Sequence, residues 1–149
     1  MNETMKTVND LLVEVFNRIL QIEEKQMKKS GVKISISELH LLENIQKSTT
    51  KTMSDVARLH QVTPGTLSVA VNVLIKKGYI HKCQSVIDKR IFILSLTEKA
   101  FHSLEVHKAF HDKMVLAVIR DLNLEAQREV VQGLQQISEY FRSYQIEDE

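Results

Sequence analysis

The sequence predicts a mainly α-helical protein with one small β-hairpin. Three observations support this fold class. Apolar residues recur at steps of three and four along most of the 149 residues, which is typical of amphipathic helices. The period changes to two only in residues 79–96, where two short strands can pair. Four glycines and one proline are too few for the turns of an all-β fold.

Composition excludes several classes of protein. A hydrophobic content of 43% with 26% charged residues is typical of a globular chain and argues against disorder. No apolar run is long enough to span a membrane and the N-terminus lacks a secretion signal, so we expect a cytoplasmic protein. The single cysteine, Cys83, agrees with a reducing compartment. Without a phosphate-binding loop, a nucleophile elbow or a cysteine-pair metal site, we expect neither an enzyme nor a cofactor.

The first three helices follow from periodicity and capping residues. Apolar residues share one face of a helix over about residues 7–28, which ends before Gly31. Ser35 and Glu38 can form a capping box that opens a second helix. Thr52 is placed to cap a third, short helix.

The fourth helix differs from an ordinary surface helix. Thr63 is a good N-cap and Pro64 suits the first helical position, so a helix is predicted over residues 64–77. Its exposed face is small, polar and uncharged until Lys76. Small hydroxyl and amide side chains suit close approach to another surface, such as the major groove of DNA. The predicted buried side consists of Leu67, Val71, Leu74 and Ile75.

The second half of the chain contains the hairpin and two more helices. Residues 79–84 and 91–96 are the predicted strands, with a charged loop between them. Thr97 caps a long helix, and a last helix follows a turn near Asn123. Positive charge is concentrated at the hairpin: residues 58–99 contain seven Lys and Arg but two Asp and Glu, whereas the whole chain has 20 and 19. This asymmetry favours a polyanion-binding centre on a helical scaffold.

Two short helices with a three-residue connector, followed by a hairpin with a basic tip, describe a winged helix-turn-helix. The wing has a specific pattern: Gly78-Tyr79-Ile80, seven residues, Asp88-Lys89-Arg90, and then Leu94-Ser95-Leu96-Thr97-Glu98-Lys99. This pattern resembles the wing signature of MarR-type bacterial transcription regulators. The chain departs from the family at Ala100, where glycine is usual, and at Val86-Ile87, which make the wing more apolar.

The resemblance implies a single MarR-type domain over residues 1–149. The winged helix-turn-helix would occupy residues 35–97, flanked by dimerisation helices at 5–30 and 98–145. Such a protein is expected to be a repressor that binds a palindromic operator in double-stranded DNA as a homodimer. Arg90 is the candidate for the minor groove, and Asp88 is expected to orient a neighbouring arginine. The residues expected to contact DNA are Thr63, Thr66, Ser68, Val69, Asn72, Lys76, Lys77, Lys82, Lys89 and Arg90.

Fragments outside the wing, among them Ile22-Glu23-Glu24 and Phe110-His111, are similar to the branch of this family that represses fatty-acid synthesis (FabT-like). This similarity implies an acyl chain carried on acyl carrier protein as corepressor. The expected effector pocket is lined by Phe16, Leu20, His40, Phe101, Leu104, His107, Phe110, His111 and Met114.

Two alternatives stay open. His107 and His111 are four residues apart on a helix and, with His40, could hold zinc, as in a zinc-responsive branch of the same family. The ligand set looks incomplete, because Met27-Lys28-Lys29 occupies the place where that branch has thiol and carboxylate ligands. A purely structural role, with the histidines hydrogen-bonding within a helix junction, is also open. The other alternative is a protein-interaction module that binds no DNA.

Overall fold

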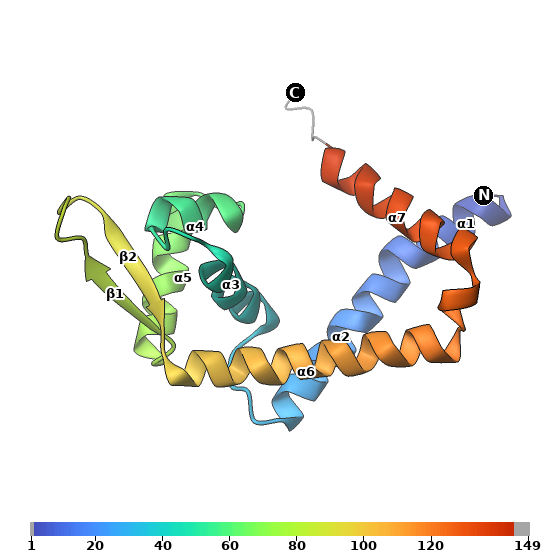
Figure 1. Cartoon of the computed structure of the whole chain (residues 1–149), viewed down its shortest axis with the longest axis horizontal. Helices are drawn as coiled ribbons and strands as arrows, with labels where there is room; N and C mark the ends of the chain where they lie inside the picture. Colours follow the sequence, from blue (N-terminus) through green and yellow to red (C-terminus); the bar gives the residue numbers. More distant parts are fainter. Residues whose placement is uncertain (1, 145–149) are drawn as a thin grey trace. The chain divides into compact units, whose positions relative to one another are not determined.

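The computed structural model describes residues 2–144, and its contacts divide the chain into two compact units, residues 1–110 and 111–149. The predicted fold class is confirmed: helices dominate, and the strands in the described part of the chain form one antiparallel hairpin (Figure 1). The predicted single domain over the whole chain stays a prediction. Residue 145, the predicted end of the last helical region, lies outside the described residues.

The first helical segment is interrupted, in contrast to the single helix predicted over residues 7–28. It consists of α1 (Glu3–Asn9), a π-helical stretch η1 (Asp10–Val15) and α2 (Phe16–Lys29). It begins earlier than predicted because the Asn2 side chain accepts a hydrogen bond from the Met5 backbone N–H at 2.8 Å. The π-helical turn changes the backbone hydrogen bonds while leaving the chain helical, so the apolar spacing gives little sign of it.

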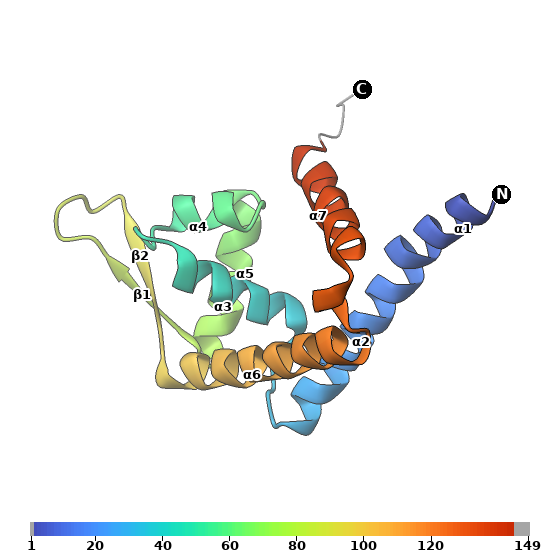
Figure 2. The same ribbon diagram turned by 45° about the vertical axis from the view of Figure 1, so that its right-hand side comes forward.

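The next three helices form the helix-turn-helix: α3 (Ile36–Lys47), α4 (Met53–Leu59) and α5 (Pro64–Lys76), seen in Figure 2 beside the hairpin. The predicted capping residues are confirmed. Ser35 Oγ accepts from the Glu38 backbone N–H at 3.1 Å, and Glu38 Oε2 accepts from the Ser35 N–H at 2.8 Å. Thr52 and Thr63 cap α4 and α5 more simply, each accepting a hydrogen bond from the backbone N–H three residues later.

The wing consists of β1 (Ile80–Gln84) and β2 (Phe92–Leu96), with Ile80 opposite Leu96 and Gln84 opposite Phe92. Gly78, at φ +83°, turns the chain from α5 into β1, a conformation that favours glycine. The Leu94 N–H donates to the Lys51 carbonyl at 2.8 Å, which ties β2 to the segment before α4. The hairpin is therefore attached to the helix-turn-helix at two places, to α5 through Gly78 and to the segment before α4 through Leu94.

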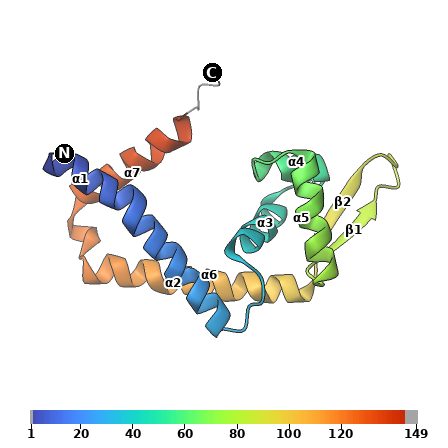
Figure 3. The same cartoon turned by 180° about the vertical axis from the view of Figure 1, so that it is seen from behind.

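An apolar core holds α5 in place. It is built from one face each of α3 and α5 together with β2, and α2 and α6 (Glu98–Asp121) add Met27 and Leu104. Figure 3 shows the loop that leads from α2 into α3. Because the buried side of α5 faces this core, its opposite side is presented to solvent. The fully buried residues at the centre are Leu39, Leu42, Ile45, Leu67, Val71, Leu74 and Leu94.

The second unit contains the end of α6, a short 3₁₀ turn η2 (Leu124–Ala126) and α7 (Arg128–Ser143). Asn123 adopts φ +50° between α6 and η2, where the sequence predicted a turn. No residue of α7 is buried within the chain. Among residues 2–144, no helix is both long and apolar enough to cross a membrane.

Candidate nucleic-acid interface

The outer face of α5 is small and polar, as predicted. Thr63, Thr66, Val69 and Asn72 are exposed, and Val69 is 67% exposed. The Thr63 hydroxyl donates to Thr66 Oγ1 at 2.9 Å and accepts from the Thr66 backbone N–H at 3.2 Å. These bonds hold the first turn of α5 and leave the Thr66 hydroxyl hydrogen for an outside acceptor. Ser68 is only half-exposed and so belongs less fully to this face.

The two lysines at the end of α5 differ from each other. Lys76 is exposed, as expected of a phosphate contact. Lys77 Nζ donates to Glu38 Oε1 at 2.6 Å and so joins the end of α5 to the start of α3. Burial raises the pKa of Glu38, but the hydrogen bonds from Lys77 and Ser35 outweigh it and hold the pKa below its ordinary value. Lys77 is thus a structural partner as well as a candidate phosphate contact.

The tip of the wing is ordered by Asp88, which confirms the predicted pairing with an arginine. The Arg90 guanidinium donates through Nε and Nη2 to the two carboxylate oxygens at 3.1 and 3.0 Å. This pairing holds the pKa of Asp88 below its ordinary value. The Arg90 side chain is nevertheless 90% exposed, so its guanidinium is oriented but accessible. Lys89 is exposed, whereas Lys82 is half-buried with Nζ 4.7 Å from the centre of the Phe92 ring.

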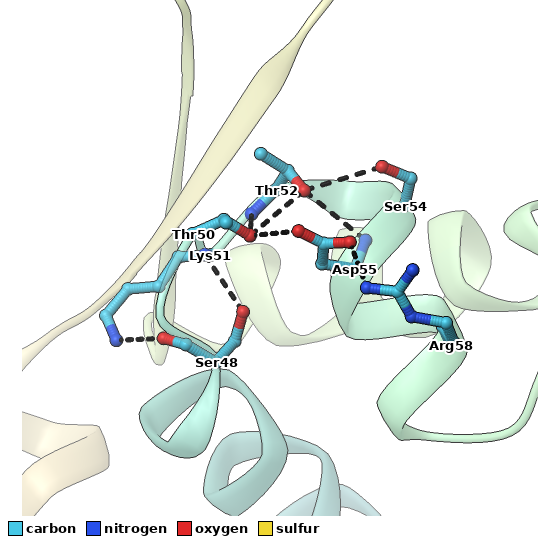
Figure 4. Close-up of polar contacts among 7 residues, drawn as sticks. All are labelled: Ser48, Thr50, Lys51, Thr52, Ser54, Asp55 and Arg58. Carbon is cyan, nitrogen blue, oxygen red and sulfur yellow. Dashed lines mark hydrogen bonds and ion pairs between the residues drawn. The ribbon is translucent and has the colours of Figure 1, made fainter.

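A network of hydroxyls and charges fixes the start of α4 (Figure 4). Thr50 and Arg58 both donate to the carboxylate of Asp55, and the Asp55 backbone N–H donates to Thr52. Hydrogen bonding to Thr50 lowers the pKa of Asp55, burial opposes this, and the Arg58 charge adds to the lowering. Lys51, at φ +54°, donates through Nζ to the Ser48 carbonyl at 2.8 Å and caps the end of α3. The turn between α3 and α4 is therefore rigid, which also fixes where α5 lies.

A buried polar cluster lies where α2, α3 and α6 meet in the first unit. His107 is 2% exposed, and its Nε2 contacts the carboxylate of Glu23, which is also 2% exposed. On its other side, Nδ1 lies 2.8 Å from Glu43 Oε1. The His107 ring therefore bridges a carboxylate of α2 and a carboxylate of α3. His40 completes the cluster, with its ring centre 5.9 Å from that of His107.

This cluster continues toward the helix-turn-helix. Asn44, one residue after Glu43 on α3, hydrogen-bonds His60 Nδ1 at 2.9 Å. His60 is the C-cap of α4, three residues before the N-cap of α5. Burial lowers the pKa of His60, and the nearby His40 lowers it further. Polar contacts thus connect the α2–α6 region with the connector that precedes α5.

The residues expected to line one effector pocket have different surroundings. Phe101 and Leu104 border a groove of about 220 Å³ together with Glu43 and Lys108. This volume is below the range of about 300–1,000 Å³ that is usual for small-molecule pockets. Leu104 also belongs to the core, and Phe16 is 59% exposed. The other predicted residues are the half-buried Leu20, His40 and Phe110, the buried His107, and His111 and Met114 of the second unit.

Sequence reasoning missed Glu23 and Glu43, the two carboxylates that contact His107. The sequence contains a signal for Glu23, because it lies four residues before the buried Met27 and so on the same face of α2. For Glu43 the signal is its position three residues after His40 on α3. Cys83 of β1 is exposed and forms no disulfide.

Three comparisons with known proteins agree with this geometry. A family model described as "Transcriptional regulator SarA/Rot" matches residues 23–105. The crystal structure of Streptococcus pneumoniae FabT in complex with DNA is 33% identical, covers 93% of this chain and 97% of that chain, and superposes with a TM-score of 0.84. Transcriptional regulator ZitR of Lactococcus lactis subsp. cremoris (strain MG1363) is 28% identical over 117 residues, 76% of this chain and 79% of that protein.

A more distantly related structure supports the fold of this chain and nothing further. Staphylococcus aureus MarR, in complex with salicylate and kanamycin, is 20% identical with a TM-score of 0.75, and 95% of each chain is covered. These relatives are transcriptional regulators rather than enzymes.

Proposed function

Because the chain belongs to the MarR/SarA family of winged helix-turn-helix transcriptional regulators, we propose that it represses transcription as a homodimer bound to a palindromic DNA operator. One observation supports this most strongly: the exposed side of α5 is hydroxyl- and amide-rich, and the wing that follows it places Lys89 and Arg90 in solvent. A surface of this kind suits base edges on the helix and phosphates beside it.

The expected roles follow from the chemistry of each side chain. Asn72 can hydrogen-bond an adenine in the major groove, Thr66 can donate to a base or a phosphate, and the exposed Val69 suits a thymine methyl group. Lys76 and Lys89 lie where they can contact phosphates. Arg90, oriented by Asp88, enters the minor groove in this proposal.

Homodimerisation is supported by the apolar faces of the terminal helices. In the first unit, Val8, Phe16 and Ile22 are 45%, 59% and 50% exposed. In the second unit, Leu134 and Phe141 of α7 are 47% and 50% exposed. Apolar surface of this extent marks a protein interface. A second copy offers the same surface and would place two α5 helices about one turn of DNA apart.

The proposal is tested by fluorescence anisotropy with an inverted-repeat duplex selected from a random pool. We expect affinity to fall steeply as salt rises, since phosphate contacts release counterions. Lys89→Ala with Arg90→Ala should weaken binding to all sequences, whereas Asn72→Ala should change the preference among sequences. Glu125→Ala, on the exposed η2 turn, is the matched control and should bind normally. A protein that selects no duplex at low salt is instead a protein-interaction module.

We further propose that the regulated genes belong to fatty-acid synthesis and that acyl-acyl carrier protein is the corepressor. The 33% identity to FabT over 93% of this chain supports this assignment. The groove beside Phe101 and Leu104 offers apolar surface, and its charged lining is balanced, with Lys47 and Lys108 against Glu43 and Glu105. A long-chain acyl carrier protein should tighten operator binding, while the unacylated carrier should not. Equal operator affinity with both forms contradicts this assignment.

A metal-responsive repressor is the second candidate, favoured by the buried contact between Glu23 and His107 Nε2. A carboxylate and an imidazole are both zinc ligands, and His111 follows one turn later on α6. Zinc would then compete with the hydrogen bond that now joins Glu23 and His107. Titration of Zn²⁺ should change operator affinity in the native chain but not in His107→Ala. An unchanged operator affinity leaves the lipid effector as the sole candidate.

A further inference from the structure

Two apolar residues at the tip of the wing are almost completely exposed. Val86 is 99% and Ile87 is 97% exposed, more than any other large apolar side chain of residues 2–144. The neighbouring wing residues Ile91 and Phe92 are 40% and 37% exposed. Val86 and Ile87 therefore contribute almost no burial to the folded chain, and their side chains are accessible from solvent.

Hydrogen bonds order the backbone of the loop that carries these two residues. Ser85 Oγ accepts from the backbone N–H groups of Ile87 and Asp88 at 3.3 and 3.4 Å. The Ser85 N–H donates to the Ile91 carbonyl at 2.8 Å, and Gln84 donates to the Lys89 carbonyl. A tip with this many internal hydrogen bonds loses little conformational entropy when it binds.

The charges around the tip identify the kind of partner. Lys89 and Arg90 follow the apolar pair directly, and the one acid of the loop, Asp88, is already paired with Arg90. Apolar side chains flanked by cations fit the minor groove of DNA, where phosphates border a narrow channel and wedges of Ile, Leu or Phe separate base pairs. The hairpin follows α5 in the same compact unit, so a duplex on α5 is within reach of the wing.

We propose that Val86 and Ile87 form an apolar wedge that enters the minor groove and partly unstacks one base step beside the site read by α5. This inference rests on the proposed DNA binding and adds a second means of recognition. Flexible pyrimidine–purine steps unstack most easily, so the wedge selects a TA or CA step without hydrogen bonds to bases. Val86 and Ile87, which make this wing more apolar than is usual in the family, would thereby help to select the operator.

The test uses the full chain and the selected operator with 2-aminopurine at the step that the wing reaches. Native protein should raise 2-aminopurine fluorescence, and Val86→Ser with Ile87→Ser should abolish the rise and lower affinity about tenfold. Replacing the TA step with AA should lower the affinity of the native protein but not of the double variant. Val86→Ile with Ile87→Leu is the matched control, which keeps the apolar wedge and should keep both signals.

The outcomes separate this inference from the proposed function. If the serine variant matches the native protein in affinity, fluorescence and step preference, the wedge is wrong while DNA binding stands. If the serine variant instead alters self-association in the absence of DNA, the apolar pair contacts a second copy and the wedge is also wrong. If the native protein selects no duplex at all, the proposed function fails first.

Discussion

The helix-turn-helix core and the terminal helices differ in the burial of their apolar residues. Leu42, Leu67 and Leu94 are fully buried where α3, α5 and β2 meet. By contrast, α1 and α7 bury no residue, although α7 has a regular apolar face that includes Leu134 and Phe141. The winged helix-turn-helix therefore has a complete apolar core within one chain. The terminal helices instead have exposed apolar surface that a second chain can cover.

The largest effect is expected from a charge on the apolar face of α7. Leu134→Glu should prevent pairing of two chains, because a carboxylate in an apolar interface loses its hydration. Loss of the bivalent arrangement should then lower operator affinity by about 10²–10⁴-fold. Sedimentation velocity and anisotropy measure both effects, with the exposed neighbour Gln135→Glu as the control. A Leu134→Glu dimer with native affinity would show that α7 is not the interface.

A core substitution should act on folding rather than on pairing. Leu42→Ala removes a fully buried side chain and should lower the free energy of unfolding by about 3–4 kcal/mol. Denaturant titration at constant protein concentration gives this value. If Leu42→Ala instead abolished the dimer and left the free energy of unfolding unchanged, the core and the dimer surface would not be independent.

The polar cluster around His107 differs from both the apolar core and the exposed terminal helices, because it is buried but polar. His107→Ala removes the imidazole that contacts both Glu23 and Glu43, and should lower the free energy of unfolding by about 2 kcal/mol. His107→Gln, which keeps a donor, should recover part of this loss. Thermal unfolding of the two variants measures the difference, and equal stability of all three chains would contradict it.

The smallest effect concerns the ion pair between α3 and α5. Glu38→Gln keeps the capping box but removes the charge that faces Lys77, and should lower the free energy of unfolding by less than about 1 kcal/mol at neutral pH. Because folding lowers the pKa of Glu38, its contribution is present at neutral pH and is lost as the pH falls through that lowered pKa. Native and variant stabilities should therefore converge in acid. A gap that persists in acid would assign the effect to lost packing instead.

The parts of the fold that local rules govern could be predicted from the sequence. Ser35, Thr63 and Pro64 specify helix starts through their own backbone chemistry, and the alternation around Leu94 specifies a strand. The candidate DNA contacts follow from the same elements, because a buried stripe on α5 fixes the opposite face. The pairing of Asp88 with Arg90 was predictable because the two residues are only two positions apart.

Long-range polar contacts were not predictable in this way. Glu23 and His107 are 84 positions apart, and neither residue's spacing specifies the other as its partner. Lys77 was expected to contact phosphate, yet it bonds Glu38, 39 positions away. The π-helical turn at Asp10–Val15 also escaped prediction, since it alters hydrogen bonding without disturbing the apolar pattern.

The central claim is that two copies of this chain place two α5 helices and two wings on one inverted repeat. Sedimentation velocity of a labelled inverted-repeat duplex, titrated with protein at low and high salt, tests it directly. The expected result is a single complex of two protomers per duplex whose affinity falls steeply as salt rises. One protomer per duplex, or binding that does not depend on salt, would contradict the account.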